Sequence, residues 1–525
     1  MKAHTTHRLL ALLLATLLML SLTACGAQPK EVADPVDDNY RTFYQIFVGS
    51  FSDSNGDGFG DLRGIINRFD YLNDGNMNSE TSLGVQGIWL SPIFSSPSYH
   101  KYDAKSYYQV DWRFGTEEDL KELAELCHSR NVKLILDLAI NHTSTQHEWF
   151  LQFKQARIDG DTQNPYYNFY TCAPTEERAK GRTYYRLGST DWWYEGNFSN
   201  EMPELDFDNP EVRQAVLDVA KYYMDLGIDG FRFDAVKYIY YNDNQQSIDF
   251  WQWYMDELKK INPDVYCVGE CWSGDGDVLK YYEALNCFNF TTSSNEGVFA
   301  STAKGNDINS LTGYVSSYQD RVLDANPEGM PQFFLANHDQ DRIAGTFLFD
   351  SQRMMVANLY LLAPGSPVIY YGEEIGMKGS RGGAMTDANR RLAMLWGDDD
   401  VRNPVGSNYP EDKQVKANVL QQLEDENSLL RHYCRLLTIR HSYPAIARGD
   451  YEKADCGSQE LGGFVISYEG QQWILLHNVG DEEITMDLSA CGLNAGKLLE
   501  VIGAGNATLK GSSLTIAGKT SVLLQ

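Results

Sequence analysis

Positive charge is scarce in this chain. Of its 525 residues, 44 are Lys or Arg and 72 are Asp or Glu, so the formal net charge at pH 7 is -28. A surface of this sign repels phosphate backbones, and nucleic acid is therefore excluded as an expected partner. Aromatic residues, in contrast, make up 12% of the chain. Flat, uncharged ligands such as sugar rings suit such a composition better than phosphates do, although aromatic side chains also fill cores.

The chain also lacks a hydrophobic run that would span a bilayer near its start. The run LLALLLATLLMLSL, residues 9–22, follows Lys2 and Arg8, and it is shorter than the roughly 20 residues that a membrane-spanning helix needs. This length and charge pattern is typical of a signal peptide. The sequence Leu-Thr-Ala-Cys-Gly that follows resembles the cleavage box of bacterial lipoproteins, in which the cysteine, here Cys25, is lipidated.

We therefore expect a lipoprotein signal peptide at residues 1–24 and a polar tether at residues 25–39. The protein is then extracellular and held at the cell membrane only by a lipid on Cys25. If that cysteine is incidental, the same signal directs plain secretion. Both alternatives place the protein outside the cytoplasm.

Closely spaced cysteine pairs are missing as well. No CxxC motif occurs, and a chain of this size does not need disulfides to be stable. Zinc ligation is therefore not expected, and we interpret the remaining cysteines as buried free thiols. They are Cys127, Cys172, Cys267, Cys271, Cys287, Cys434, Cys456 and Cys491.

There is no internal repeat or low-complexity tract; instead, apolar and β-rich runs alternate with helical patterns such as 117–131 and 209–227. Alternation of this kind predicts a parallel sheet covered by helices. Eight such runs predict a (β/α)8 TIM barrel. The runs are residues 42–51, 85–94, 132–142, 227–237, 265–272, 284–290, 331–341 and 366–377.

Two segments do not fit the barrel pattern. About ninety residues separate the third and fourth runs, far more than the 2–6 residues of a typical βα loop, and we interpret residues 143–205 as a small inserted domain. After Ser442, short alternating strands with Gly and Asn turns predict a C-terminal antiparallel β-sandwich over residues 442–525. The barrel itself would then comprise residues 40–142 and 206–441.

Polar residues stand at the carboxyl ends of several predicted strands, where barrel active sites lie. One charged strand end alone, such as Arg232 and Asp234 in GIDGFRFDAVK, is explained as well by a structural ion pair as by a functional role. Several charges of both signs on one rim are harder to explain structurally. They are Asp137, Asn141 and His142 on the third strand, Arg232 and Asp234 on the fourth, Glu270 on the fifth, and His338, Asp339 and Asp341 on the seventh.

Four of these segments, DLAINH, GFRFDAVK, GECW and ANHDQD, resemble in order the four sequence regions of the α-amylase family, glycoside hydrolase family 13. One tetrapeptide alone is weak evidence, but four in order on a predicted barrel are strong. The similarity extends over nearly the whole chain from about Tyr40. It implies a retaining hydrolase that acts on α-glucans such as starch and maltodextrins.

The resemblance implies roles for three carboxylates. Asp234 would be the nucleophile, Glu270 the general acid and then base, and Asp339 the group that stabilises the oxocarbenium-like transition state. Retaining hydrolysis needs the first two groups about 5 Å apart. Glu270 must hold a proton near neutral pH, so we expect burial and neighbouring negative charge to raise its pKa.

The resemblance also implies substrate-binding residues. Arg232 would keep Asp234 ionised and oriented, His142 and His338 would hydrogen-bond sugar hydroxyls, and the ring of Tyr102 would stack on the sugar. The full set of expected substrate-binding residues is Tyr102, Asp137, His142, Arg232, Lys237 and His338.

The stretch DSNGDGFGD near the N-terminus places oxygen donors at positions 1, 3, 5, 7 and 9 of a calcium loop. These are the side chains of Asp53, Asn55, Asp57 and Asp61 and the carbonyl of Phe59. Position 12 is Gly64 rather than Glu, so the loop is not an EF-hand; it resembles the calcium loop of the oligo-1,6-glucosidase side of the family. A structural Ca2+ is expected, and the alternative is a solvated acidic turn.

Three features bear on specificity. Tyr99 stands where exo-acting relatives have an aspartate, Ala235 resembles the α-1,4-acting members, and residues 201–211 resemble a family region intermediate between oligo-1,6-glucosidases and neopullulanases. The first two features predict an α-amylase that cleaves internal α-1,4 bonds through a covalent intermediate, and the third leaves mixed specificity open. We expect the protein to be a monomer. The alternatives are an exo-acting α-glucosidase, a neopullulanase-like or cyclomaltodextrinase-like hydrolase with some transglycosylation, and a non-catalytic starch-binding lipoprotein.

Overall fold

The computed structural model describes residues 38–305, 307–399 and 401–525. The predicted signal peptide, the lipidated Cys25 and most of the tether lie outside the described residues. Within the described ranges, no helix has both the length and the apolar character that crossing a bilayer requires.

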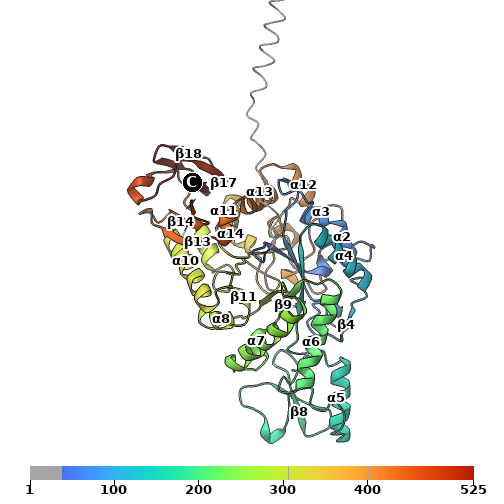
Figure 1. Ribbon diagram of the computed structural model, residues 1–525. Coiled ribbons are helices and arrows are strands. Elements are labelled where there is room, and N and C mark those ends of the chain that lie inside the picture. The colour runs from blue at the N-terminus through green and yellow to red at the C-terminus, as the bar shows by residue number, and fades with distance from the viewer. Residues whose placement is uncertain (1–37, 306, 400) are drawn as a thin grey trace, which may run out of the picture.

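A parallel sheet forms the centre of the molecule, which confirms the predicted (β/α)8 barrel (Figure 1). Its seven named strands are hydrogen-bonded in the order β11-β10-β9-β5-β2-β1-β12. The residues of these strands are almost all buried because helices cover the outside and side chains fill the inside. The strands are β1 (Phe43–Ile46), β2 (Gly87–Leu90), β5 (Lys133–Leu138), β9 (Gly230–Phe233), β10 (Tyr266–Gly269), β11 (Asn286–Cys287) and β12 (Val368–Tyr370).

The seventh expected strand, at residues 331–341, is not a continuous strand. Single parallel bridges join Phe288 to Gln332 and Phe334 to Val368, and these close the barrel between β11 and β12. Pro331 at the start of this segment has no N–H to donate to a neighbouring strand, and the chain turns into a loop a few residues later. Closure therefore depends on a short stretch of pairing rather than on a ladder.

The helices lie around the barrel, and several begin where the sequence predicts. α4 starts with a capping box formed by Thr116 and Asp119, and α6 starts with the Asn209 cap followed by a proline. The helices are α2 (Leu62–Asn67), α3 (Phe69–Leu72), α4 (Glu117–Ser129), α5 (Glu148–Asp159), α6 (Pro210–Asp225), α7 (Asn244–Ile261), α8 (Asp275–Tyr281), α9 (Val298–Ala303), α10 (Ile308–Ala325), α11 (Asp350–Leu361), α12 (Val419–Glu424), α13 (Leu429–Ser442) and α14 (Ala445–Arg448).

The segment between β5 and α6 projects from the barrel, at the lower right of Figure 1. It contains α5 and a three-stranded antiparallel sheet in the order β6-β8-β7. At its base, Asn141 donates a hydrogen bond to Glu204, so the start and the end of the segment meet. Its strands are β6 (Cys172–Pro174), β7 (Tyr184–Arg186) and β8 (Trp192–Glu195); a separate hairpin, β3 (Phe94–Ser95) with β4 (Ser106–Val110), follows β2.

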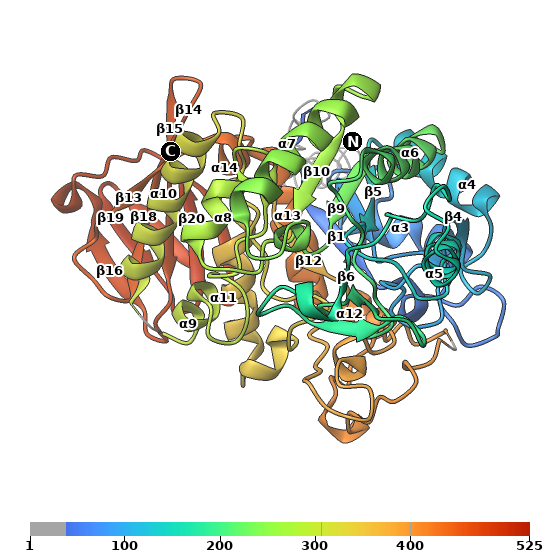
Figure 2. The ribbon, with the colours of Figure 1, turned by 90° about the horizontal axis from the view of Figure 1, so that it is seen from below.

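The C-terminal part consists of two antiparallel sheets, as predicted, on the side of the barrel covered by α10 and α11 (Figure 2). One sheet has the order β13-β14-β15-β20-β17 and the other β16-β19-β18. Leu476, Leu514 and Val522 belong to the small core that these sheets share. The strands are β13 (Asp450–Ala454), β14 (Leu461–Tyr468), β15 (Gln471–Asn478), β16 (Ile484–Asp487), β17 (Leu498–Gly503), β18 (Ala507–Lys510), β19 (Ser513–Ile516) and β20 (Thr520–Leu524).

The eight cysteines of the described ranges are all free. Cys127, Cys267, Cys271, Cys287 and Cys434 are buried, as expected of thiols that fill a core. Three others, at positions 172, 456 and 491, are only half-buried.

Candidate active site

A cavity of about 460 Å³ opens at the carboxyl ends of the barrel strands. Three carboxylates line this cavity. Asp234 follows β9, Glu270 follows β10, and Asp339 belongs to the seventh expected strand at residues 331–341. These residues are far apart in the sequence, and parallel strands bring their ends to one rim. The rest of the wall comes from loops, in particular Tyr99, His100, Tyr102, His142, Phe198, Ser199, Met202, Ala235, Trp272, Met385, Thr386, Asp387 and Arg391.

Arg232 lies beneath the floor of this cavity, fully buried on β9. Its Nη1 donates to Asp137 Oδ1 at 2.7 Å and to Asp234 Oδ1 at 2.8 Å. Its Nη2 lies 3.1 Å from Glu270 Oε1, an ion-pair contact whose angle is poor for a hydrogen bond. One guanidinium thus neutralises part of the charge of three carboxylates, which lowers the free-energy cost of burying them together.

Glu270 is the carboxyl group with the clearest catalytic character. Burial, together with the negative charges of Asp234 and Asp339, raises the pKa of Glu270 to about 8, although Arg232 acts in the opposite direction. A carboxyl group with this pKa keeps its proton at neutral pH. It can therefore serve as a general acid.

The backbone after Asp234 is unusual. Ala235 has a φ of 48° and a ψ of 46°, a left-handed conformation that costs a non-glycine residue about 1 kcal/mol or more. In this conformation the Ala235 N–H donates to Glu270 Oε2 at 3.1 Å. The strained residue thus connects the strand that carries Asp234 to the side chain of Glu270.

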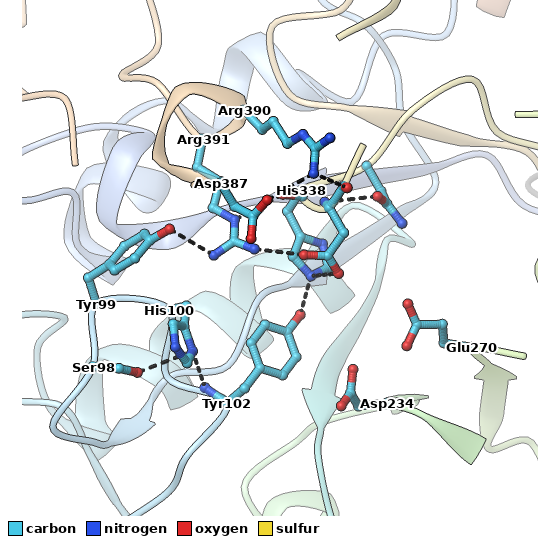
Figure 3. Close-up of polar contacts among 12 residues, drawn as sticks. Ser98, Tyr99, His100, Tyr102, Asp234, Glu270, His338, Asp387, Arg390 and Arg391 are labelled. Atoms are coloured by element: carbon cyan, nitrogen blue, oxygen red, sulfur yellow. Dashed lines mark hydrogen bonds and ion pairs between the residues drawn. The ribbon is translucent and has the colours of Figure 1, made fainter. Parts of the chain in front are cut away.

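Asp339 has the opposite electrostatic environment, which is set by His338 and Arg391, both labelled in Figure 3. Burial alone would raise its pKa, but His338 and the Arg391 guanidinium outweigh burial and hold the pKa of Asp339 well below its usual range. The distances are 3.1 Å from His338 Nε2 to Asp339 Oδ2 and 2.6 Å from Arg391 Nη2 to Asp339 Oδ1. Asp339 therefore stays ionised at neutral pH.

A hydrogen-bonded chain fixes the ring of Tyr102. The side-chain nitrogen of Gln45 lies 2.7 Å from His338 Nδ1, and His338 Nε2 lies 2.6 Å from the Tyr102 oxygen. The Tyr102 hydroxyl in turn donates to Asp137 Oδ2 at 2.8 Å. Burial raises the pKa of Asp137 to about 6, against the effect of Arg232.

His142 is buried in the cavity wall, and burial lowers its pKa so that the ring is neutral. Its Nε2 has no hydrogen-bond partner within the described protein. Unpaired polar atoms in a buried position are costly, and a ligand hydroxyl in the cavity would satisfy this one.

Not every expected substrate-binding residue borders the cavity. Tyr102 and His142 do, whereas Asp137, Arg232 and His338 lie behind it and act through the carboxylates and Tyr102. Lys237 lies in the 3-10 turn Val236–Tyr238 and is not among the lining residues.

The structure adds lining residues that sequence reasoning missed. Arg391 donates from Nη1 to the Tyr99 hydroxyl at 3.0 Å and from Nη2 to Asp339, so it joins the loop after β12 to the loop after β2. Burial lowers the pKa of His100 to about 4. Neither residue stands at the end of a predicted strand. The only sequence signal for His100 was the nearby Tyr102, and the only one for Arg391 was the pair of arginines in NRRLAM.

The predicted calcium loop lies after β1. Asp53 Oδ1 accepts from Asn55 N at 3.0 Å, Asp57 Oδ1 accepts from Phe59 N at 2.8 Å, and Asp61 Oδ1 accepts from Gly64 N at the start of α2. Among the described residues, no group of three or more His, Cys, Asp or Glu side chains is arranged to hold a metal. The all-oxygen donor set nevertheless suits Ca2+, because a carboxylate has about four lone pairs and one accepted N–H leaves others free.

Comparison with known proteins agrees with this geometry. The family model for the α-amylase catalytic domain matches residues 45–449. The chain belongs to the α-amylase family. The match covers the barrel from the middle of β1 onward and the inserted segment, and it includes all three cavity carboxylates.

Two curated members of this family are similar over most of the chain. Alpha-amylase 3 of Dictyoglomus thermophilum is 33% identical over 92% of this chain and 92% of its own length. Oligo-1,6-glucosidase of Bacillus cereus is 28% identical over 85% of this chain and 91% of its own length. Among solved structures, Amy13B of Eubacterium rectale is 31% identical, with a TM-score of 0.86 over 93% of this chain and 96% of that one.

Proposed function

We propose that this member of the α-amylase family hydrolyses internal α-1,4-glucosidic bonds of starch and maltodextrins with retention of configuration. The observation that carries the proposal is the arrangement of Asp234 and Glu270 at one cavity, both contacted by Arg232, with Glu270 protonated at neutral pH. A nucleophile and a protonated acid are the two groups that retaining hydrolysis needs.

In the first step, a carboxylate oxygen of Asp234 attacks the anomeric carbon and the bond from that carbon to the leaving oxygen breaks. Glu270 gives its proton to the leaving oxygen, so the shortened chain departs as an alcohol. In the second step, Glu270 takes a proton from water, the water oxygen attacks the anomeric carbon, and the bond to Asp234 breaks. Asp339, ionised throughout, stabilises the positive charge that develops on the sugar ring.

Internal cleavage of α-1,4 bonds is supported by Tyr99 and Ala235. Tyr99 occupies a place in the cavity wall where the exo-acting relatives are expected to have a carboxylate, and its hydroxyl is engaged by Arg391. The similarity to a protein named alpha-amylase 3 agrees with this proposal. The similarity to oligo-1,6-glucosidases favours, as the second candidate, an exo-acting or mixed specificity with some transglycosylation.

Digestion of reducing-end-labelled maltoheptaose, followed by chromatography, distinguishes the candidates. Internal cleavage gives maltose and longer products of several lengths from the first minutes, whereas glucose and labelled maltohexaose as the only early products would refute it. Asp234→Asn should lower kcat on soluble starch by about 10⁴-fold or more with an unchanged circular dichroism spectrum. Full activity of this variant would refute the mechanism, whereas a wild-type protein that binds starch but releases no product would favour the non-catalytic alternative.

We also propose a structural Ca2+ held by Asp53, Asn55, Asp57, the Phe59 carbonyl and Asp61. When bound, the ion would stabilise the loop after β1; it has no part in the bond-breaking steps above. Adding Ca2+ to chelator-treated protein should raise Tm, and Asp57→Asn should reduce this increase while Asp70→Asn, on α3 outside the loop, should not. An equal response of all three proteins would argue against the site.

Finally, we propose export and lipid anchoring at Cys25. Cells that produce the full chain should incorporate labelled palmitate into it and retain it in the membrane fraction. Cys25→Ser should abolish the label, and labelling that persists in this variant would contradict the proposal.

A further inference from the structure

Lys101 is an unusual residue in the loop that connects β3 and β4. Its φ is 69°, in the left-handed region that residues with a long side chain rarely adopt. Its side chain is also buried, with 2% of its surface exposed, and burial lowers the pKa of Lys101 although Asp111 acts in the opposite direction. Backbone strain and a buried charge in one residue are both unfavourable, so a compensating role is expected.

The charge of Lys101 is not needed to neutralise its partner. Lys101 Nζ donates to Asp111 Oδ2 at 2.6 Å and lies 5.5 Å from the ring centroid of Phe114. Asp111, however, also accepts from Arg113 Nε at 2.9 Å and from Arg113 Nη2 at 3.2 Å. This bidentate contact would keep Asp111 paired without the lysine. Neutralising Asp111 therefore does not explain why Lys101 is buried.

Hydrogen bonds within the loop fix the chain on the N-terminal side of Lys101. Ser96 Oγ donates to Asp103 Oδ1 at 2.8 Å, and Ser98 Oγ donates to the same oxygen. The Lys101 N–H donates to Ser98 Oγ at 3.1 Å. The ion pair with Asp111, which directly follows β4, adds a fixed point outside the loop. Lys101 is thus held through both its backbone and its side chain.

The residues on both sides of Lys101 border the active-site cavity: Tyr99, His100 and Tyr102. The ring centroid of His100 lies 5.6 Å from that of Tyr99 and 6.0 Å from that of Tyr102. Figure 3 shows the His100 ring between the two tyrosines. A different backbone conformation at Lys101 would change the direction in which its neighbours point. The placement of these rings in the cavity wall therefore depends on the conformation that Lys101 holds.

His100 has a hydrogen-bond donor for a ligand in this cavity. Burial lowers the pKa of His100 to about 4, so its ring is neutral at neutral pH. The Tyr102 N–H donates to His100 Nδ1 at 3.2 Å. Because a backbone N–H can only donate, the hydrogen of the neutral ring is on Nε2. Nε2 makes no hydrogen bond within the part of the chain that the structure describes, so this donor is available to a ligand.

We propose that His100 Nε2 donates a hydrogen bond to the bound glucan and that Lys101 is the positioning residue that holds this donor in place through its ion pair with Asp111. The inference rests on the proposed function in taking an α-glucan as the ligand. It gives the strained, buried lysine a role. The unfavourable conformation of Lys101 is offset because the cavity wall has its binding geometry before the substrate arrives.

Substitutions at both positions test the two parts of the proposal. His100→Leu removes the donor, whereas His100→Gln keeps an N–H donor at a similar distance from the backbone. Lys101→Met keeps the length of the side chain and removes its charge. Lys101→Gly adopts a φ of 69° without strain, so it is the second variant if the methionine variant does not fold. Lys121→Met, which removes the ion pair of an exposed lysine on α4 with Glu117, is the matched control.

We expect His100→Leu to lower kcat/KM for maltoheptaose by roughly five- to tenfold, the effect of one lost hydrogen bond, and His100→Gln and the control to stay within about twofold of the wild type. Lys101→Met should lower kcat/KM by roughly tenfold or more with an unchanged circular dichroism spectrum. Adding His100→Leu to Lys101→Met should cost nothing further, because the donor is already out of place. Losses that multiply in the double variant, or equal losses in His100→Leu and His100→Gln, would overturn the proposal.

Binding separates this outcome from a failure of the proposed function. In a Glu270→Gln background, titration calorimetry should show that His100→Leu weakens maltoheptaose binding by roughly five- to tenfold and that it has no further effect once Lys101→Met is present. Equal affinity for maltoheptaose with and without the His100 donor would refute the proposal whatever bond the enzyme cleaves. Glucose and maltohexaose as the only early products of the wild-type protein would refute internal cleavage, and the binding result would still stand.

Discussion

Two buried glutamates in this barrel have the same pKa and different surroundings. Glu270 is 7% exposed and Glu373 is 5% exposed, and burial raises the pKa of each to about 8. Glu270 faces the active-site cavity together with Asp234 and Asp339 and contacts the Arg232 guanidinium. Glu373 does not border that cavity; its Oε1 accepts hydrogen bonds from the hydroxyls of Tyr360 at 2.6 Å and Tyr433 at 3.0 Å.

The difference shows that a raised pKa alone does not identify a catalytic acid. Both glutamates follow a barrel strand, and both are protonated at neutral pH. Only Glu270 is next to a second carboxylate that could act as nucleophile, and only it has a cavity through which a substrate can arrive. Glu373 is instead part of the packing between the barrel and α11 and α13. Its neighbour Glu374 accepts from Tyr44 on β1 and Tyr71 on α3.

The same substitution in both glutamates gives the largest expected contrast. Glu270→Gln removes the proton that the leaving group needs, and we expect kcat on starch to fall by about 10³–10⁴-fold. Glu373→Gln should keep kcat within about threefold, because it touches no lining residue of the cavity. Rates on starch of the two purified variants, with circular dichroism to verify folding, make the comparison. A large loss of kcat in a Glu373→Gln variant that still folds would show that Glu373 is not purely structural.

The contact with Arg232 also distinguishes the surroundings of Glu270 from those of Glu373. Arg232→Lys cannot contact Asp137, Asp234 and Glu270 at once, and we expect kcat to fall by about 10²-fold. Arg232 lowers the pKa of Glu270, and a lysine that pairs with the two aspartates leaves Glu270 without this close contact, so the alkaline limb of the pH–rate profile should move to higher pH. Loss of protein stability alone would not move this limb, so an unshifted limb would contradict the positioning role of Arg232.

Glu373 should affect how the free energy of unfolding depends on pH. Its pKa is about 8 in the folded protein and close to the ordinary value of 4.5 when unfolded, so between about pH 5 and pH 8 the folded state keeps a proton that the unfolded chain has lost. The contribution of this group to the free energy of unfolding therefore falls as pH rises across that window.

Glu373→Gln cannot ionise and avoids that loss. Relative to the wild type, its free energy of unfolding should improve by on the order of 2 kcal/mol between pH 5 and pH 8, with a matching rise in relative Tm. Thermal melts of both proteins at the two pH values provide the measurement. A difference in Tm that does not change with pH would mean that Glu373 does not titrate in this range.

The smallest expected difference between the wild type and Glu373→Gln is in the pH dependence of activity. The acid form of Glu270 is required, so kcat/KM should fall about tenfold per pH unit above about pH 8. Glu373→Gln should show the same limb as the wild type. Initial rates on maltoheptaose from pH 6 to pH 10 provide the profile, and an alkaline limb that moves in Glu373→Gln would show that the two sites are coupled.

The amino-acid sequence alone predicted much of this protein. Alternation of buried strands with capped helices predicted the barrel, because apolar periodicity and helix caps are local patterns that can be read from the sequence. The charged strand ends indicated Asp234, Glu270 and Asp339 as one constellation, since parallel strands bring their carboxyl ends together. The short turn signals after Ser442 predicted the C-terminal sheets for the same local reason.

Only the tertiary structure decided the rest. The loop after β12 places Arg391 against Asp339 and Tyr99, and no local pattern determines where a long loop lies. The seventh strand is reduced to single bridges. Pro331 has no N–H to donate to a neighbouring strand, and the chain turns into a loop a few residues later. Glu270 and Glu373 look alike in the sequence, one in GECW and the other in YYGEEIGM. They differ because pKa, access to the cavity and ion pairing depend on which side chains the fold brings within a few ångströms.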